Sequence, residues 1–180
     1  MSSSRPLRRS TAAALCLALA LLLPFISGQI PRVGNALCLI HIPIFLAGFL
    51  CGAPWGLAVG FIAPLLRSFL FHAPPLYPRA IAMAFELATY GFVAGALYRS
   101  FKKTKRGCYA ALVIAMLSGR VVWGIMRYLL DGLGGSEFPF SAFIAGGFLE
   151  AIPGIILHLI IIPVLVSALE KAMPETRPGF

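Results

Sequence analysis

The sequence predicts an all-α membrane protein, a bundle of about six transmembrane helices with both termini in the cytoplasm. Of its 180 residues, 59% are hydrophobic and only 12% are charged, whereas a soluble domain carries about 25% charged residues. The apolar residues form runs of about 20, the length that crosses a bilayer as a helix. The basic residues flank these runs, which is typical of the charge bias that orients membrane proteins. The net charge of +9 therefore indicates a lipid bilayer and not a nucleic acid as the partner.

Six apolar segments are expected to form the helices, separated by sequences that disfavour helix continuation. The separators are the proline- and glycine-rich stretches "GQIPRVG", "CGAPWG", "HAPPLYPR" and "DGLGGSEFP", together with the basic stretch "RSFKKTKR". The expected helices cover residues 9–27, 34–52, 54–72, 79–99, 108–131 and 139–169.

Two of these segments do not fit a single straight transmembrane helix. Pro43 divides the second segment, and the "GAPWG" link after it leaves little room for a turn. The sixth is longer than one span, so Pro153 and Pro163 are expected to kink it, unless its end leaves the membrane.

Lysine and arginine counts orient the bundle. With the N-terminus inside, ten basic residues fall on the inner side and two, Arg32 and Arg79, on the outer side. The positive-inside rule then makes residues 1–8 a cytoplasmic basic N-terminus, 9–170 a single transmembrane domain and 171–180 a cytoplasmic tail. Residues 2–28 also have the order of a cleaved signal peptide. A retained first helix is preferred, because the rest of the chain is also embedded and needs an insertion start.

Five charged residues fall inside these apolar segments. Arg67 interrupts "GFIAPLLRSFLF", Glu86 interrupts "AIAMAFELATYGF", and Arg120, Arg127 and Glu150 lie in the last two segments. A charge in hydrocarbon costs roughly 2.5–3.5 kcal/mol on insertion scales, so such side chains normally pair or line a wet cavity. Counting residues from the helix ends places four of them at similar levels in the outer half, with Arg120 near the middle.

Two interpretations of these charges remain open. In the first, Arg67–Glu86 and Arg127–Glu150 are buried ion pairs that only hold helices together. In the second, the charges line a polar pocket open to the outside. Three arginines against two glutamates would then leave one cation for an anionic group of a substrate.

Two further residues are candidates for the same pocket. Trp123 shares a helix face with Arg120 and Arg127, three residues after the first and four before the second, and is placed to stack on a ligand. Asn35, in the first outer loop, is a candidate to cap the pocket.

Motifs for catalysis and for metal binding are absent from the sequence. It contains no GxSxG, Walker or HExxH pattern, and its four cysteines show no CxxC spacing. His41 is expected to be a hydrogen-bonded interior residue, and no cofactor or metal site is predicted. The alternatives are a structural membrane protein with buried ion pairs, or a small integral-membrane enzyme using Ser118 or Ser141 near His158.

One stretch resembles a known family. Residues 41–101 combine a proline-marked second helix and a Gly-rich link with "GFIAPLL" (60–66), "PPL" (74–76) and "MAFELATYG" (83–91). Together with the six-helix pattern, these motifs resemble the substrate-binding S components of energy-coupling factor (ECF) transporters.

The resemblance implies a function. Such proteins bind a vitamin or related micronutrient in an outward-facing pocket of the bacterial plasma membrane, and work with a membrane coupling subunit and two ATPases. The family's AxxxA motif on helix one, which contacts the coupling subunit, matches Ala14 and Ala18. Metal-specific relatives use an N-terminal histidine, whereas position 2 here is Ser2.

The resemblance also bears on the pocket. The family's pockets are built from the outer halves of helices four to six and from the first and third outer loops. That position supports Glu86, Trp123, Arg127 and Glu150, and it supports Arg67 less directly.

Overall fold

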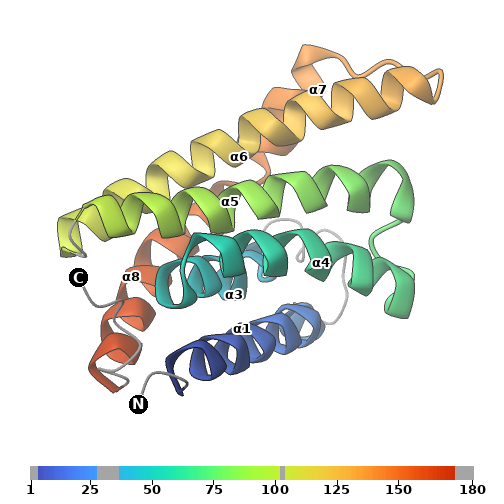
Figure 1. Cartoon of the computed structure of the whole chain (residues 1–180). Coiled ribbons are helices and arrows are strands. Elements are labelled where there is room, and N and C mark those ends of the chain that lie inside the picture. Colours follow the sequence, from blue (N-terminus) through green and yellow to red (C-terminus); the bar gives the residue numbers. More distant parts are fainter. Residues whose placement is uncertain (1–3, 28–36, 102–103, 173–180) are drawn as a thin grey trace.

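The computed structural model describes residues 4–27, 37–101 and 104–172, and these residues form helices and turns without a strand (Figure 1). The elements are α1 (Ser4–Leu22), η1 (Leu23–Ser27), α3 (His41–Leu46), η2 (Ala47–Cys51), α4 (Ala53–Phe71), η3 (Leu76–Ala80), α5 (Ile81–Ser100), α6 (Lys105–Leu133), α7 (Phe140–Ile144), η4 (Ala145–Leu149) and α8 (Ile152–Ala172).

Five helical stretches are long and apolar enough to cross a membrane: Leu7–Ile26, Ala53–Phe71, Leu76–Ser100, Lys105–Leu133 and Phe140–Ala172. Many of the large apolar side chains on their outer faces are exposed, as expected where lipid is the solvent. The predicted fold class, an all-α multi-pass membrane protein, is confirmed.

The second segment is shorter than predicted. Instead of a helix over 34–52, α3 and η2 together cover only His41–Cys51, or about 16 Å at 1.5 Å per residue. Every residue of this stretch is buried, so it lies inside the bundle and not against lipid. Pro43 does not divide it, because it sits in the first helical turn, where a backbone N–H has no intrahelical partner.

The sixth segment is interrupted near its first proline. A short helix, α7, and a π-helical turn, η4, end at Leu149, and α8 begins at Ile152, next to Pro153. Pro163 lies inside α8, where the helix continues through it. The predicted break at Pro153 is thus present, and it places Glu150 at the bend between the two parts.

Helices α4 and α5 form the tightest pair in the bundle and lie side by side (Figure 1). Gly56 of α4 faces Gly91 of α5, and a Cβ atom on either residue would collide with the backbone of the other. Gly60 approaches the backbone of Leu87 in the same way. Small residues at such positions allow close approach of membrane helices, so this pair is a rigid support for the elements around it.

The start of α1 and the end of α8 lie at the same end of the bundle in Figure 1. The basic residues Arg9, Arg99, Lys105, Arg106 and Lys171 belong to this end, because they lie at the start of α1, the end of α5, the start of α6 and the end of α8. The opposite end holds the polar residues described next. Which of the two ends faces the cytoplasm stays a prediction from the charge bias.

Candidate functional site

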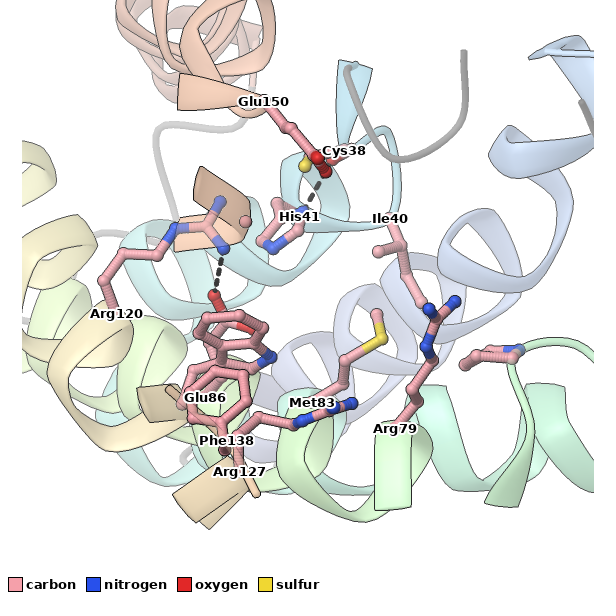
Figure 2. A pocket seen from close by; sticks show the side chains of 13 residues that line it. Cys38, Ile40, His41, Arg79, Met83, Glu86, Arg120, Arg127, Phe138 and Glu150 are labelled. Atoms are coloured by element: carbon pink, nitrogen blue, oxygen red, sulfur yellow. Dashed lines mark hydrogen bonds and ion pairs between the residues drawn. The ribbon is translucent and has the colours of Figure 1, made fainter. Parts of the chain in front are cut away.

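A cavity of about 280 Å³ opens among the start of α3, the first half of α5, the second half of α6 and η4. Figure 2 shows its lining, which comes from α3, η3, α5, α6, η4 and the segments next to them. The lining residues are Cys38, Ile40, His41, Pro74, Arg79, Met83, Glu86, Arg120, Trp123, Arg127, Phe138, Gly146 and Glu150.

The buried second helical segment separates two cavities. Cys38 and His41, at the start of α3, line this one, whereas Cys51, at the end of η2, lines a separate cavity at the basic end. The segment His41–Cys51 covers only about 16 Å of the roughly 30 Å of a bilayer core, so its two ends reach both cavities from inside the bundle.

An ion pair forms the floor of the cavity. Nη1 of Arg120 lies 2.9 Å from Oε1 of Glu86, and Figure 2 marks this contact. The hydroxyl of Tyr90, one turn further along α5, donates to the same oxygen at 2.7 Å. Both charged side chains are buried, so each compensates the other where water is excluded.

Aromatic side chains form one wall. Trp123 contacts Phe138 edge to face, at 5.7 Å between ring centroids, and its other neighbour Phe143 lies nearly parallel to it at 6.3 Å. The guanidinium of Arg127 lies 5.2 Å from the Phe138 ring centroid. Arg127 also pairs with Asp131, one turn later on α6, at 2.8 Å. The wall therefore combines flat apolar surface with an oriented, partly compensated cation.

Two histidines meet at the backbone carbonyl of Cys38. Nδ1 of His41 lies 2.8 Å from this oxygen and Nε2 of His158 lies 3.2 Å from it (Figure 2 marks the first contact). A carbonyl oxygen only accepts hydrogen bonds, so each of these ring nitrogens carries a proton. In neutral His41, Nε2 is then an acceptor, and it has no hydrogen-bond partner in the described part of the chain.

The rim carries two opposite charges. Arg79, before α5, and Glu150, between η4 and α8, both line the cavity and are both exposed. Among the described residues, neither forms an ion pair. An anionic group and a hydrogen-bond donor could each find a partner at this rim.

A comparison with protein families matches residues 8–166 to one described as "ECF transporter, substrate-specific component". The match covers most of the chain. The chain belongs to this family. It is therefore a substrate-specific subunit of an ECF transporter and a multi-pass membrane protein, and members of the family are transport subunits rather than enzymes. Comparisons with curated proteins and with solved structures found no significant match.

The structure brings together five of the residues singled out in this S component. Glu86, Arg120, Trp123, Arg127 and Glu150 all line the cavity. Asn35 lies outside the described residues. Ala14 and Ala18 lie on the exposed face of α1, one helical turn apart.

Arg67 is not part of this cavity, and the ion pair expected between Arg67 and Glu86 does not form. Its Nη1 instead donates to the carbonyl oxygen of Leu21 at 2.9 Å. Its guanidinium lies 5.4 and 5.7 Å from the ring centroids of Phe25 and Phe71. Arg67 therefore connects α4 to the end of α1. It projects from a side of α4 that faces away from Glu86.

The other pair of the ion-pair interpretation, Arg127–Glu150, does not form either, because Arg127 pairs with Asp131. The spacing of four residues within a helix could have indicated this pair. The glycine-rich stretch from Asp131 onward predicts a loop there, whereas α6 continues to Leu133.

For several residues that line the cavity, nothing in the sequence distinguishes them from ordinary loop or core residues. The charge count assigns Arg79 only to an outer loop, and Phe138 and Cys38 lie in no recognisable motif. His41 is the interior histidine that was expected, and it also borders the cavity. In the described ranges, no group of three histidine, cysteine or acidic side chains is placed to hold a metal ion.

Proposed function

We propose that this S component captures a small organic micronutrient of the vitamin class from outside the cell, in the cavity beside Trp123. A separate membrane coupling subunit and two ATPases would then drive its release inward. Binding itself is an equilibrium step and needs no chemistry on the ligand. The observation that carries the proposal is a polar cavity, with an aromatic wall and a buried ion pair, at one end of an otherwise apolar bundle.

The distribution of charge supports an outward-facing cavity. The basic residues at the other end of the bundle, such as Arg99 and Lys105, are the ones that the positive-inside rule assigns to the cytoplasm. A scavenging protein must bind on the opposite side. The cavity, with its rim of Arg79 and Glu150, is at the end of the bundle away from these basic residues, which supports an outward-facing site.

The lining supports a compact ligand with a flat part and an anionic group. The volume of about 280 Å³ lies just below the roughly 300–1,000 Å³ found for small-molecule sites, which suits a compact ligand. Trp123 and Phe138 offer flat surface for a ring. Arg120 and Arg127 already have carboxylate partners, so Arg79 is the lining arginine that offers its charge to an anionic group.

A partner surface on α1 supports the assembly part of the proposal. Ala14 and Ala18 are exposed at a spacing that permits close helix approach, whereas Ala13 and Ala20 point into the bundle. We propose that the coupling subunit packs against this small-residue face.

Identification of the bound molecule tests the proposal. The S component, purified in mild detergent, is expected to retain a small molecule that mass spectrometry of the denatured protein identifies. Replacement of Arg79 or Arg127 by alanine is expected to weaken its binding, because each removes a cation from the cavity.

The main alternative is a membrane protein whose charges only hold helices together. It would be supported if Arg127→Ala and Glu86→Gln lowered the thermal midpoint while leaving the affinity for the co-purified molecule unchanged. Failure to recover any bound molecule at all, from cells grown in rich medium, would also count against the proposal.

A further inference from the structure

A second cavity, of about 450 Å³, lies at the opposite, basic end of the bundle. It is formed where the start of α1, the end of η2, the start of α4 and the end of α5 meet. None of its lining residues borders the first cavity, the proposed ligand cavity beside Trp123. The proposed uptake function uses no part of it, so it needs an explanation of its own.

The charge of this cavity is entirely positive. Arg9 of α1 and Arg99 of α5 line it from two different helices, and within the described residues neither has an ion-pair partner. The acidic residues that the structure describes all lie elsewhere; they are Glu86, Asp131, Glu137, Glu150 and Glu170. Glu170, the one near the end of α8, accepts a hydrogen bond from Tyr98 and borders a separate groove.

The backbone and an aromatic residue add to this character. The chain turns at Gly52, whose positive φ of 104° starts α4, and space is open where a side chain would stand. The first turn of α4 has no side-chain cap, so its N–H groups add positive potential beside the two arginines. Trp55 lies at the mouth, partly exposed. Tryptophan is enriched at the level where lipid headgroups begin.

An apolar track leads away from the cavity toward the middle of the bundle. On α5, Arg99, Ala96 and Phe92 share one face at spacings of three and seven residues, and Phe92 is exposed. On α4, Ile62 is exposed two turns beyond Trp55. A ligand whose anionic group sits between the arginines would therefore have an apolar surface along which hydrocarbon chains can lie.

We infer that this cavity binds the headgroup of an anionic phospholipid, with its phosphate held by Arg9 and Arg99. Basic pockets between transmembrane helices on the cytoplasmic side bind phospholipid headgroups, and two guanidinium forks suit a phosphate group. The lipid would bridge α1 and α5, two helices that pack mainly against other elements in the described part of the chain. This inference does not depend on which micronutrient the other cavity takes.

Native mass spectrometry of the full chain in dodecyl maltoside tests the inference. Dioleoyl phosphatidylglycerol and dioleoyl phosphatidylcholine are added in equal amounts, so that the two lipids differ only in the headgroup. One phosphatidylglycerol is expected to remain on the wild-type protein in preference to phosphatidylcholine. Arg9→Gln and Arg99→Gln are each expected to lower its retention roughly fivefold, since a basic residue near the surface contributes on the order of 1 kcal/mol.

Arg106→Gln is the matched control. Arg106 lies at the same end, in the first turn of α6, and is exposed, but it does not line the cavity. Its loss changes the net charge equally and is expected to leave retention unchanged. If either cavity variant does not fold, as judged by its thermal midpoint without lipid, the corresponding Arg→Lys variant is used; it keeps the charge and is expected to show an intermediate loss.

Three results would overturn the inference. Equal retention of the two lipids by the wild-type protein would show that the arginines serve another partner, such as an acidic surface of a protein. An equal loss in Arg106→Gln would show general surface attraction only. Displacement of the lipid by millimolar glycerol phosphate or inorganic phosphate would assign the cavity to a soluble phosphate compound.

Discussion

Arg120 and Glu86 form a 2.9 Å ion pair across the contact between α5 and α6, with side chains only 11% and 2% exposed. Tyr90 donates to the same carboxylate oxygen. The pair closes the inner end of the ligand cavity and also joins two of the long helices. It can therefore act on ligand affinity and on stability, and the two effects can be separated.

Removing one partner of this pair is expected to destabilise the protein more than removing both. Glu86→Leu leaves Arg120 as an unpaired charge in a buried site, a change that typically costs about 3–5 kcal/mol. The double variant Glu86→Leu, Arg120→Leu removes both charges and is expected to recover most of this loss. Unfolding free energies from titration with sodium dodecyl sulfate measure the difference; losses that simply add would show that the two residues act independently.

The close approach of α6 to α5 predicts a strong effect of a single methyl group. A Cβ at Gly119 would overlap the ring of Tyr90, which is buried and stacked on Phe45. Gly119→Ala is expected to cost about 1–3 kcal/mol of stability, as overpacking usually does. Gly132→Ala on the same helix is the control, because nothing lies within 4 Å of a Cβ there; a similar loss in both variants would contradict the explanation.

Trp123 is expected to matter for ligand affinity, and Trp55 is not. Trp123 presents its ring to the cavity and contacts Phe138, whereas Trp55 lines the cavity at the opposite end. Trp123→Leu is expected to weaken binding of the co-purified molecule about tenfold, because an aromatic pair contributes roughly 0.5–1.5 kcal/mol beyond its buried area. Calorimetric titration measures both variants; equal affinities for Trp123→Leu and Trp55→Leu would rule out a stacking role.

The sequence was sufficient for the bundle and for the level of the charged residues. Run lengths and proline positions predicted the long helices, because a span in lipid must be apolar and hydrogen-bonded within itself. Helical rise then placed Glu86, Arg127 and Glu150 near one another along the bundle axis. The same rise put Arg67 at that level, but it says nothing of which way a side chain points around the axis.

The rotation of each helix about its own axis decides which charged side chains meet. This rotation depends on how the helices pack, which cannot be read from the spacing of residues along the sequence. Gly56, Gly60 and Gly91 fix α4 against α5, and this turns Arg67 toward α1 and leaves Glu86 facing α6. The short length of the second helix also depends on packing that the sequence does not show. Its composition suits a span, but its complete burial removes the need to match the bilayer thickness.

The position of Arg67 predicts a structural role without an effect on the ligand. Its guanidinium donates to the carbonyl of Leu21 and lies beside the contacting rings of Phe25 and Phe71. Arg67→Gln is expected to cost about 1.5–3 kcal/mol, the range for hydrogen bonds to charged groups, and to leave the affinity of the co-purified molecule unchanged. A tenfold loss of affinity in a variant with normal stability would place Arg67 at the ligand after all.

The exposed alanines of α1 predict a separation of assembly from binding. Ala14→Phe and Ala18→Phe add bulk to a face that no other part of the described chain covers, so folding and ligand affinity are expected to be retained. Close approach by the coupling subunit would be blocked, and co-purification of the tagged S component with its coupling subunit is expected to be lost.

A matched substitution decides whether bulk at this face is the cause. Ile114→Phe adds a phenyl group to α6, at a residue that is also exposed to lipid, and it is expected to leave the complex intact. If Ala14→Phe and Ala18→Phe formed the complex as well as Ile114→Phe, the coupling subunit would have to bind elsewhere. In that case the spacing of Ala14 and Ala18 would reflect only the alanine-rich composition of α1.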